Sequence, residues 1–535
     1  MNRKEVVDSF LNKNYLVSPC FLDSFNENDS FVDEVGDKLK GKEKIVVLNK
    51  DLLVLLKNKE SSFETNWLEF DKSRTHFEKG KDNKIYETFL RILSHNILDE
   101  RKAVSVKEID KKINKDRVVV KNYVEEENKK REVTNFVNYF RVRYEALRKI
   151  LMGRQELQNT LSINKLLNKK DRETVGLIGF VSDKRITKNG NIIVLLEDKT
   201  GTTNIIINKS KESLFKIAKD LVLDEVIGIT GFNGEGVVFV NNLYLPEVPM
   251  NREIKKIDEE IYVGFISDIH VGSNNFLEKE FLSFIDWLNG KGNNKRHKDL
   301  ALKIKYLFIV GDLVDGVGIY PDQNKDLLIL DVKEQYDKLA YYLKLIREDI
   351  KIIICPGNHD ALRLSVPQPI LNKELAEKIY ELKNVTLVTN PAYVNIEAKE
   401  NFPGFDVLMY HGNSFHYYIE NVDSLRFSNA RDYPSNISKF LLQRRHLAPS
   451  HASTLYVPDE REDPLVIDKI PDIMVSGEMH RTDVGSYNNV IIINTSCWQS
   501  KTEYEEKLGN NPDPGKFPIL NLKTREVNIL KFYEQ

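Results

Sequence analysis

Cysteine, net charge and long apolar runs are all scarce in this 535-residue chain. Its three cysteines, Cys20, Cys355 and Cys497, lie far apart and form no CxxC pair. This pattern argues against a disulfide framework and against a zinc site, and it favours a reducing compartment. No run approaches the ~18 apolar residues of a membrane span, and the N-terminus lacks the apolar stretch of a signal peptide. We therefore expect a cytoplasmic protein with no membrane partner.

The near absence of net charge excludes a global attraction to DNA or to anionic lipid. Lys and Arg number 79 against 81 Asp and Glu, which gives a formal net charge of -2. Hydrophobic residues at 41% and charged residues at 30% are typical of a soluble globular chain. The length is enough for about two to four domains. Any contact with nucleic acid must therefore come from local patches on one of several modules.

The first 172 residues change character along their length. Residues 1–70 mix short apolar groups with Asn, Lys and Glu, and we expect a small helical domain there. Charge dominates residues 71–132, which predicts a flexible linker. Residues 133–172 are predicted to form an amphipathic helix and a connection, because apolar residues recur there at helical spacing. The residues of that apolar stripe are Val133, Phe136, Val137, Phe140, Tyr144, Leu147 and Leu151.

Residues 173–250 change to the two-residue period of strands. A short helix is predicted at 213–221, between the third and fourth of five strands. The predicted strands are 175–181, 192–197, 203–208, 226–231 and 237–243. This order is that of an OB-fold barrel. Such barrels bind single strands or serve as structural modules, and the shortage of basic and aromatic residues here favours a structural role.

Residues 255–535 carry the candidate chemistry, because five apolar strand-like runs each end in a polar cluster. These clusters are Asp268 with His270, Asp312 with Asp315, Asn358 with His359 and Asp360, then His411, then Glu478 with His480. In a layered α/β domain the carboxyl ends of the strands gather at one edge, so the clusters are expected to form one site. Carboxylates, imidazoles and an amide suit Mn, Fe or Zn better than calcium. Two such ions would hydrolyse a phosphodiester.

The motifs DxH, GDxxD, GNHD, a strand-end His and GxxH resemble, in this order, those of the calcineurin-like metallophosphoesterases. Each is weak alone, since DxH can be a surface pair and a strand-end His a satisfied core residue. Longer stretches are similar to the small subunits of archaeal family-D DNA polymerases, over about residues 135–535. They are 265–273 (FISDIHVGS), 308–316 (FIVGDLVDG), 409–414 (MYHGNS), 443–449 (QRRHLAP) and 490–502 (VIIINTSCWQSKT).

The resemblance implies a multidomain α/β fold in which a helical N-terminal region and an OB-fold precede a layered phosphoesterase domain. It also implies which residues hold two divalent ions. Asp268, His270 and His480 would bind the first, Asp312 would bridge both, and Asn358 and His411 would bind the second. Glu478 stands where the family usually has a histidine. A carboxylate there favours harder ions, so we expect Mn, with Mg, Fe or Zn as alternatives.

The remaining roles concern the leaving group and the DNA. His359 would protonate the leaving 3′ oxygen, and Asp360 would orient its imidazole. Asp315 would either support a metal ligand without binding the ion itself, or accept hydrogen bonds from the backbone N–H groups at the start of a helix. Four further residues are candidates for DNA contact, namely Phe415, Tyr417, Arg444 and Arg445. The aromatic pair could stack on an unpaired base or pack in the core. The arginines could bind phosphates, cap a helix end or bind a partner.

The function expected from this resemblance is that of the small subunit of a heteromeric archaeal replicative polymerase. It would proofread as a two-metal 3′→5′ exonuclease and would scaffold the large catalytic subunit. Its expected partners are that subunit and the single-stranded or frayed 3′ end of DNA, with the sliding clamp as a further candidate. The alternative is a catalytically inactive scaffold with a vestigial site, which Glu478 alone favours.

Overall fold

The computed structural model divides the chain into two compact units, Met1–Lys112 and Ile113–Gln535. The structure describes residues 16–17, 47–48, 118–123, 130–166, 169, 172–234, 236–292, 294–502, 505–506 and 509–533. In the first unit, β1 (Leu16–Val17) and β2 (Val47–Leu48) pair in parallel. These four residues are extended and not helical, and the rest of the helical domain predicted for 1–70 lies outside the described residues. Within the described part of the chain, no helix is both long and apolar enough to cross a bilayer.

Helix α7 (Val133–Met152) begins at the residue where the sequence pattern predicts it. Its buried face differs from the predicted stripe, because Val133 is 80% exposed whereas Tyr139 and Arg143 are fully buried. The C-terminal half packs through Leu147 against the barrel. Two short helices then lead into the barrel, η1 (Gln155–Leu157) and α8 (Ile163–Leu166).

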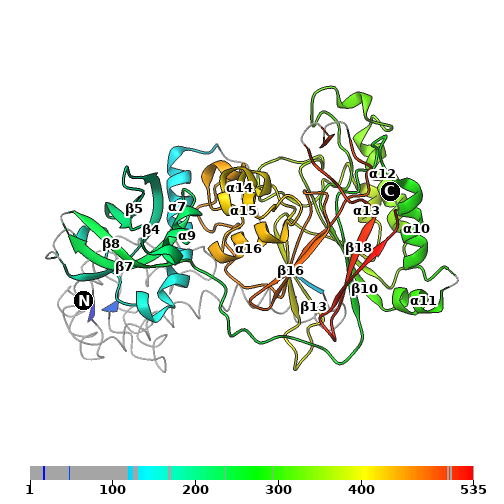
Figure 1. Cartoon of the computed structure of the whole chain (residues 1–535). Coiled ribbons are helices and arrows are strands. Elements are labelled where there is room, and N and C mark those ends of the chain that lie inside the picture. The colour runs from blue at the N-terminus through cyan, green and yellow to red at the C-terminus, as the bar shows by residue number, and fades with distance from the viewer. Residues whose placement is uncertain are drawn as a thin grey trace, which may run out of the picture. The chain divides into compact units, whose positions relative to one another are not determined.

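Five strands close into a barrel in the order β4-β5-β6-β8-β7 (Figure 1). They are β4 (Thr174–Ile186), β5 (Ile192–Asp198), β6 (Gly201–Ile207), β7 (Val226–Gly234) and β8 (Val237–Tyr244). Helix α9 (Glu212–Lys219) connects β6 to β7. Alternate residues point inward, as the two-residue period of a strand requires, so that Val194 and Leu196 of β5 are fully buried. All five strands and the helix lie within a few residues of their predicted positions.

The described residues after the barrel, together with β3, form two six-stranded sheets. The first has the order β12-β11-β10-β9-β18-β19, and the second has the order β16-β17-β15-β14-β13-β3. The first contains β9 (Tyr262–Ile266), β10 (Ile304–Val310), β11 (Lys351–Cys355), β12 (Val385–Leu387), β18 (Lys516–Asn521) and β19 (Val527–Lys531). The second contains β13 (Ala392–Ile396), β14 (Phe405–Met409), β15 (Ile473–Ser476), β16 (Asp483–Tyr487), β17 (Val490–Asn494) and β3 (Val118–Lys121). Strands β9 to β12 run parallel, as do β14, β15 and β17.

The two sheets pack face to face and are covered by helices on their outer faces (Figure 1). On β9, Phe265 faces the second sheet, whereas Ile266 faces the helices over the first sheet. Those helices are α10 (Glu278–Leu288), α11 (Lys295–Leu302), α12 (Val332–Lys344) and α13 (Glu377–Tyr380). Over the second sheet lie α14 (Phe415–Asn421), α15 (Asp423–Phe427) and α16 (Ser435–Arg444). Because the central strands are buried on both faces, their sequences are continuous apolar runs.

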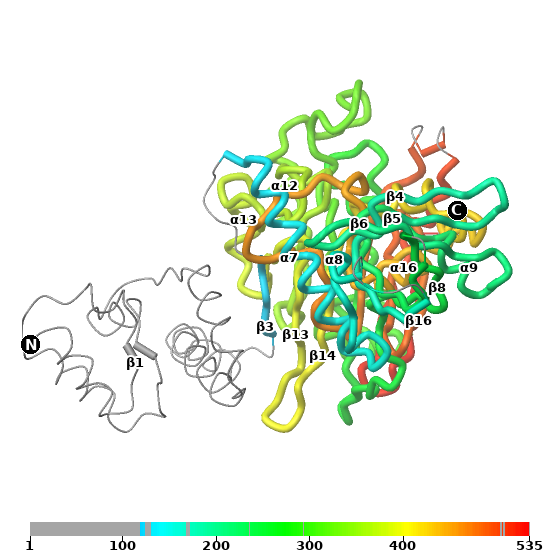
Figure 2. Tube along the Cα trace, turned by 90° about the vertical axis from the view of Figure 1, so that its left-hand side faces the viewer, coloured from blue at the N-terminus to red at the C-terminus, as the bar shows by residue number. Residues whose placement is uncertain are grey.

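Strand β3 corrects the prediction for part of the segment 71–132. Its four residues pair antiparallel with β13 at the edge of the second sheet (Figure 2). Just beyond it, the hydroxyl of Tyr123 donates to Asp459 at 2.8 Å. These residues are therefore part of the sheet and not a flexible linker, because three successive valines suit a pleated, half-buried edge.

Arg444 links the barrel to α16, and Arg445 bonds the segment before β15, which corrects the prediction that they contact DNA. Both side chains are buried. The guanidinium of Arg444 pairs with Glu225 at 2.9 Å and donates to the carbonyl of Asp220. Arg445 donates to the carbonyl of Ile467 at 2.6 Å. Their hydrogen bonds are therefore made inside the molecule and not on a surface that DNA could reach.

A buried polar cluster joins helix α7 to Asp463 and His446, which belong to the part of the chain that contains the second sheet. Arg143 donates to Asp463 at 2.6 Å, and the same carboxylate accepts from Tyr139 at 2.6 Å. His446 completes the cluster with its Nε2 at 2.9 Å from Asp463. The Asp463 carboxylate accepts all three bonds, so the buried charges of the cluster are paired.

Candidate functional site

The five polar clusters predicted at strand ends converge at the carboxyl edge of the two sheets. Asp268 and His270 follow β9, and Asp312 follows β10. The other sheet contributes His411 after β14 and His480 after β15. Parallel strands present their carboxyl ends at one edge, so residues up to 212 positions apart meet here.

One cluster consists of Asp268, His270 and His480, whose potential ligand atoms all lie within 4.8 Å of one another. The two imidazoles face each other through their Nε2 atoms at 3.2 Å. His480 Nε2 also lies 3.3 Å from Asp268 Oδ1. Two nitrogens and an oxygen directed at one point are a donor set suited to Mn, Fe or Zn.

A second cluster forms around His411. Its Nε2 lies 3.3 Å from Asp312 Oδ1 and 3.0 Å from Glu478 Oε2. Among the described residues, neither this nitrogen nor the buried Oδ1 of Asn358 has a hydrogen-bond partner of acceptable geometry. A buried polar atom without a partner costs about 1–3 kcal/mol, so both atoms are well placed to hold a cation.

Asp312 lies between the two clusters, with one carboxylate oxygen directed at each. Its Oδ1 faces His411 at 3.3 Å, whereas its Oδ2 faces His270 Nε2 at 3.9 Å. The side chain is buried and receives a further bond at Oδ1 from the backbone N–H of His359. A carboxylate in this arrangement is able to bridge two ions.

Each of the three candidate imidazole ligands is oriented by a bond to its second nitrogen. His270 Nδ1 bonds Asp315 at 3.1 Å, and His411 Nδ1 bonds the carbonyl of Val310 at 2.8 Å. His480 Nδ1 bonds Glu505 at 2.7 Å. Because a carbonyl or carboxylate oxygen only accepts, the proton lies on Nδ1 and the lone pair of Nε2 faces the site.

The backbone of the site is strained. Five site residues without the freedom of glycine have positive φ, from 50° to 68°, namely Asp268, His270, Asp312, Glu478 and His480. Such conformations cost of order 1–3 kcal/mol each and cluster at functional sites. Gly357 is required for the same close packing, because a Cβ there would lie 2.2 Å from Asp312 Oδ1. The turn after β11 can therefore lie this close to Asp312 because residue 357 has no side chain.

Charges within the site stabilise one another against burial. Burial favours the neutral forms, but Asp312 raises the pKa of His411, and His411 in turn lowers the pKa of Asp312. Burial likewise opposes the charge on Glu478, yet His411 and His416 hold the pKa of its carboxyl low. The carboxylates of Asp312 and Glu478 are therefore held in their ionised form by neighbouring imidazoles.

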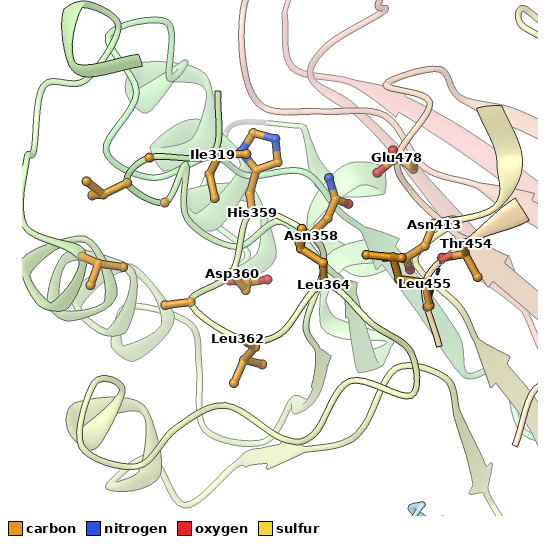
Figure 3. A pocket seen from close by; sticks show the side chains of 15 residues that line it. Ile319, Asn358, His359, Asp360, Leu362, Leu364, Asn413, Thr454, Leu455 and Glu478 are labelled. Carbon is orange, nitrogen blue, oxygen red and sulfur yellow. Dashed lines mark hydrogen bonds between the residues drawn. The ribbon is translucent and has the colours of Figure 1, made fainter. Parts of the chain in front are cut away.

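The site opens into a cleft of about 720 Å³. Asn358, His359 and Glu478 are among the side chains that line it (Figure 3). Partly exposed apolar residues form much of the rest of the lining, including Ile319, Leu364 and Leu455. His359 bonds the carbonyl of Asp315 through Nδ1 at 2.9 Å. A group entering the cleft would meet His359 and, from the second cluster, Asn358 and Glu478.

Comparison with known proteins identifies the family. The family model for the B subunits of DNA polymerases alpha and epsilon matches residues 263–484, which include all five strand ends. The DNA polymerase II small subunit of Methanothermobacter thermautotrophicus is 37% identical over 390 residues, 73% of this chain and 78% of that one. The DNA polymerase II small subunit of Archaeoglobus fulgidus is 38% identical over 416 residues, which are 78% of this chain and 80% of that one.

The chain belongs to the DNA polymerase II small-subunit family. This confirms the predicted resemblance to the archaeal family-D small subunits. The small subunit of Methanocaldococcus jannaschii is 39% identical over 392 residues, which are 73% of this chain but only 64% of the longer relative.

Within this member of the family, two predicted roles need correction. Asp360 does not touch His359, because its carboxylate turns inward and accepts from the N–H of Gly357 at 2.8 Å and from Tyr336 at 3.1 Å. Burial, and then the nearby Asp312, raise the pKa of Asp360 to about 7. Asp360 therefore shapes the GNHD turn and does not orient the imidazole.

Of the two aromatic residues predicted to contact DNA, one is fully buried and the other is half-buried. Phe415 is fully buried among the core residues under α14, so it cannot stack on a base. Tyr417 is half-buried, and its contact with DNA stays a prediction.

Several residues that support the ligands were not predicted from the sequence. Glu505 bonds His480, while Gln323 and Gln499 donate to the carboxylate of Asp315 at 2.8 and 3.2 Å. His416 lies beside Glu478. Gln499 lies in the quoted stretch 490–502, but neither it nor the other three is assigned a contact by a motif, so only the tertiary structure shows what the four residues contact.

Proposed function

We propose that this chain is a two-metal phosphodiesterase that removes nucleotides from the 3′ end of DNA, as the proofreading subunit of a family-D polymerase. One observation supports this above the others, namely that the two oxygens of Asp312 face two separate ligand clusters. A shared carboxylate between two N/O donor sets is the arrangement used for in-line displacement at phosphorus. The cleft beside the second cluster, lined by Asn358, His359 and Glu478, is large enough for a nucleotide.

The residues at the site fit two divalent ions. Asp268, His270 and His480 would hold one ion; Asn358, His411 and Glu478 would hold the other; Asp312 would be shared. When bound, the ions would polarise the phosphate and lower the pKa of water at the site. The ligand set has more oxygen donors around the second ion, because Glu478 supplies a carboxylate there. This favours Mn or Mg over Zn.

His359 is the residue placed to protonate the leaving oxygen. Its Nδ1 is held by the carbonyl of Asp315, so Nε2 is the atom that can give up a proton in the cleft. Burial disfavours a charged ring, but Asp312 and Asp315 raise the pKa of His359. The ring is therefore suited to hold the proton that the leaving 3′ oxygen needs.

The barrel and the outer helices support a second role as a scaffold for the large catalytic subunit. We propose that the barrel is an OB-fold and that the two sheets have the calcineurin-like layout. The buried bonds of Arg444 to Glu225 and Asp220 hold the barrel on the phosphoesterase domain. A rigid two-domain body offers a broad surface to the large subunit, whether or not the site is active. The sliding clamp is a further candidate partner.

Nucleotide release tests the proposal. A DNA primer with a mismatched 3′ end is incubated with Mn and the purified chain, with and without the large subunit, and the released mononucleotides are counted. We expect Asp312→Asn to lower the rate by at least about 10³-fold, since it weakens the carboxylate shared by both ions. Asp299→Asn on exposed α11 is the matched control and should keep the wild-type rate.

The outcomes separate the two candidate roles. Release by the wild type and the control, with loss in Asp312→Asn, supports the exonuclease. Absence of release in every arm, including the complex with the large subunit, would contradict it and would favour the inactive scaffold, for which the carboxylate at Glu478 is the structural argument.

A further inference from the structure

His416 contacts the candidate site from a position that no ligand motif includes. It is the second residue of α14, and its Nε2 lies 3.4 Å from Glu478 Oε1. The side chain of Glu478 is only 14% exposed, whereas that of His416 is 41% exposed. The more exposed His416 thus lies beside the nearly buried carboxylate of Glu478.

The two oxygens of Glu478 are divided between two imidazoles. Oε2 lies 3.0 Å from His411 Nε2, the nitrogen that also faces Asp312. Oε1 lies on the side of His416. One oxygen therefore points to the candidate second ion, and the other is left for an orienting partner.

The local backbone explains how one short segment contacts both oxygens. Gly412 separates His411 from the start of α14, and a Cβ at this glycine would lie 2.8 Å from the Cβ of Glu478. Its φ of 129° lies in the region that favours glycine. The N–H of Phe415 donates to the carbonyl of Gly412 at 2.8 Å, which turns the chain so that His416 follows at the first turn of the helix.

We propose that His416 is a positioning residue that donates a hydrogen bond from Nε2 to Oε1 of Glu478 and so directs Oε2 toward the second divalent ion. This inference rests on the proposed function. A glutamate has more rotatable bonds than an aspartate or a histidine, so a free Glu478 would lose more side-chain entropy on binding an ion. An imidazole that fixes the distal oxygen reduces this cost, as the supporting bonds to His270 and His480 do for their rings.

The same contact reduces repulsion among the acidic groups. Asp268, Asp312 and Glu478 place three carboxylates around the clusters, and all three are buried or nearly so. Glu478 has two imidazole neighbours, His411 and His416, and only His411 is itself a proposed metal ligand. Loss of His416 would leave Oε1 without this donor, and the carboxylate would be free to rotate out of the cleft.

Binding of Mn to the full-length chain tests the inference without relying on activity. Free Mn is measured by electron paramagnetic resonance during titration of the wild type, His416→Ala, His416→Gln, Glu478→Ala and the double variant Glu478→Ala/His416→Ala. His297→Ala on exposed α11 is the control. Thermal melting of each metal-free variant checks that it folds, as expected for a substitution at the half-exposed position 416.

We expect His416→Ala to weaken one of two Mn sites by about 10-fold or more, the usual effect of losing a supporting bond to a ligand. His416→Gln should recover most of the affinity, because its amide can donate to the same oxygen. In the Glu478→Ala background, removing His416 should have no further effect, since the oxygen that it holds is gone.

Two results would overturn the inference in distinguishable ways. A wild-type chain that binds fewer than two Mn ions would contradict both the inference and the two-metal proposal. If the wild type binds two ions but His416→Ala binds them as tightly, or if His416→Ala is equally harmful without Glu478, only the inference on His416 fails.

Discussion

At the scale of single residues, sequence motifs identify the side chains that face the site, but not the side chains that orient them by hydrogen bonds. His480 follows β15 in a recognisable pattern, whereas its partner Glu505 lies 25 residues later in a charged stretch with no motif. Asp360 shows the opposite case. Its place in the GNHD motif predicts contact with His359, but a carboxylate three residues after Gly357 satisfies the N–H of its own turn first.

Loss of the Glu505 carboxylate should weaken metal binding. Burial opposes its charge, but the bond to His480 lowers the pKa of Glu505 to about 2, so it is ionised at neutral pH. We expect Glu505→Gln to reduce Mn affinity by about 10- to 100-fold, measured by calorimetric titration. The neighbouring exposed Glu506→Gln should leave the affinity unchanged, and an equal effect of both variants would contradict a role specific to Glu505.

His446 should make stability depend on pH below neutrality. Burial, and then the charge on Arg143, lower its pKa to about 4 from an ordinary value near 6.5. Between these values the unfolded chain binds a proton that the folded chain does not, so stability falls as the pH drops from about 6.5 to about 4. The full shift corresponds to about 3 kcal/mol.

The measurement for His446 is the urea midpoint of unfolding at pH 7 and at pH 4.5. The wild type should lose more stability between the two than His446→Asn, which has no titrating ring. The comparison uses the difference between pH values, so a uniform destabilisation by the substitution does not affect it. Equal losses in both proteins would show that His446 is not buried as a neutral group.

At the scale of elements, the sequence predicted part of the second unit, because the periodicity of those segments is strong and their turns contain glycine, but it assigned none of the helices α10 to α16 that cover the two sheets. The five barrel strands and the start of α7 are examples of the predicted segments. The face of α7 was predicted less well. Val133 and Val137 continue the apolar stripe but are exposed, while Arg143 is buried because Asp463, 320 residues away, pairs with it. Spacing along one helix carries no information about such a partner.

The docking of α7 should depend on Arg143. Arg143→Met leaves the buried Asp463 without its cation, and we expect a loss of about 3–5 kcal/mol in the free energy of unfolding, measured in urea. Arg141→Met, two residues earlier on the exposed side of the same helix, should change stability by at most about 0.5 kcal/mol. Similar small effects for both would contradict the role of the buried cluster.

At the scale of the whole molecule, the two six-stranded sheets hold residues from five strand ends in one place. Ions that bind only this assembled site should stabilise the fold by mass action, by about 2.7 kcal/mol per site at 100 times the dissociation constant. We therefore expect Mn to raise the midpoint of thermal unfolding of the wild type and of Asp299→Asn, but to raise that of Asp312→Asn much less. Equal shifts in all three proteins would mean that Mn acts elsewhere.

Anomalous X-ray diffraction from crystals grown with Mn can show whether two ions share Asp312. We expect two peaks about 3.5–4 Å apart, one beside Asp268, His270 and His480 and the other beside Asn358, His411 and Glu478, with Asp312 between them. A single peak, or two peaks that do not share Asp312, would contradict the proposed sharing of this carboxylate.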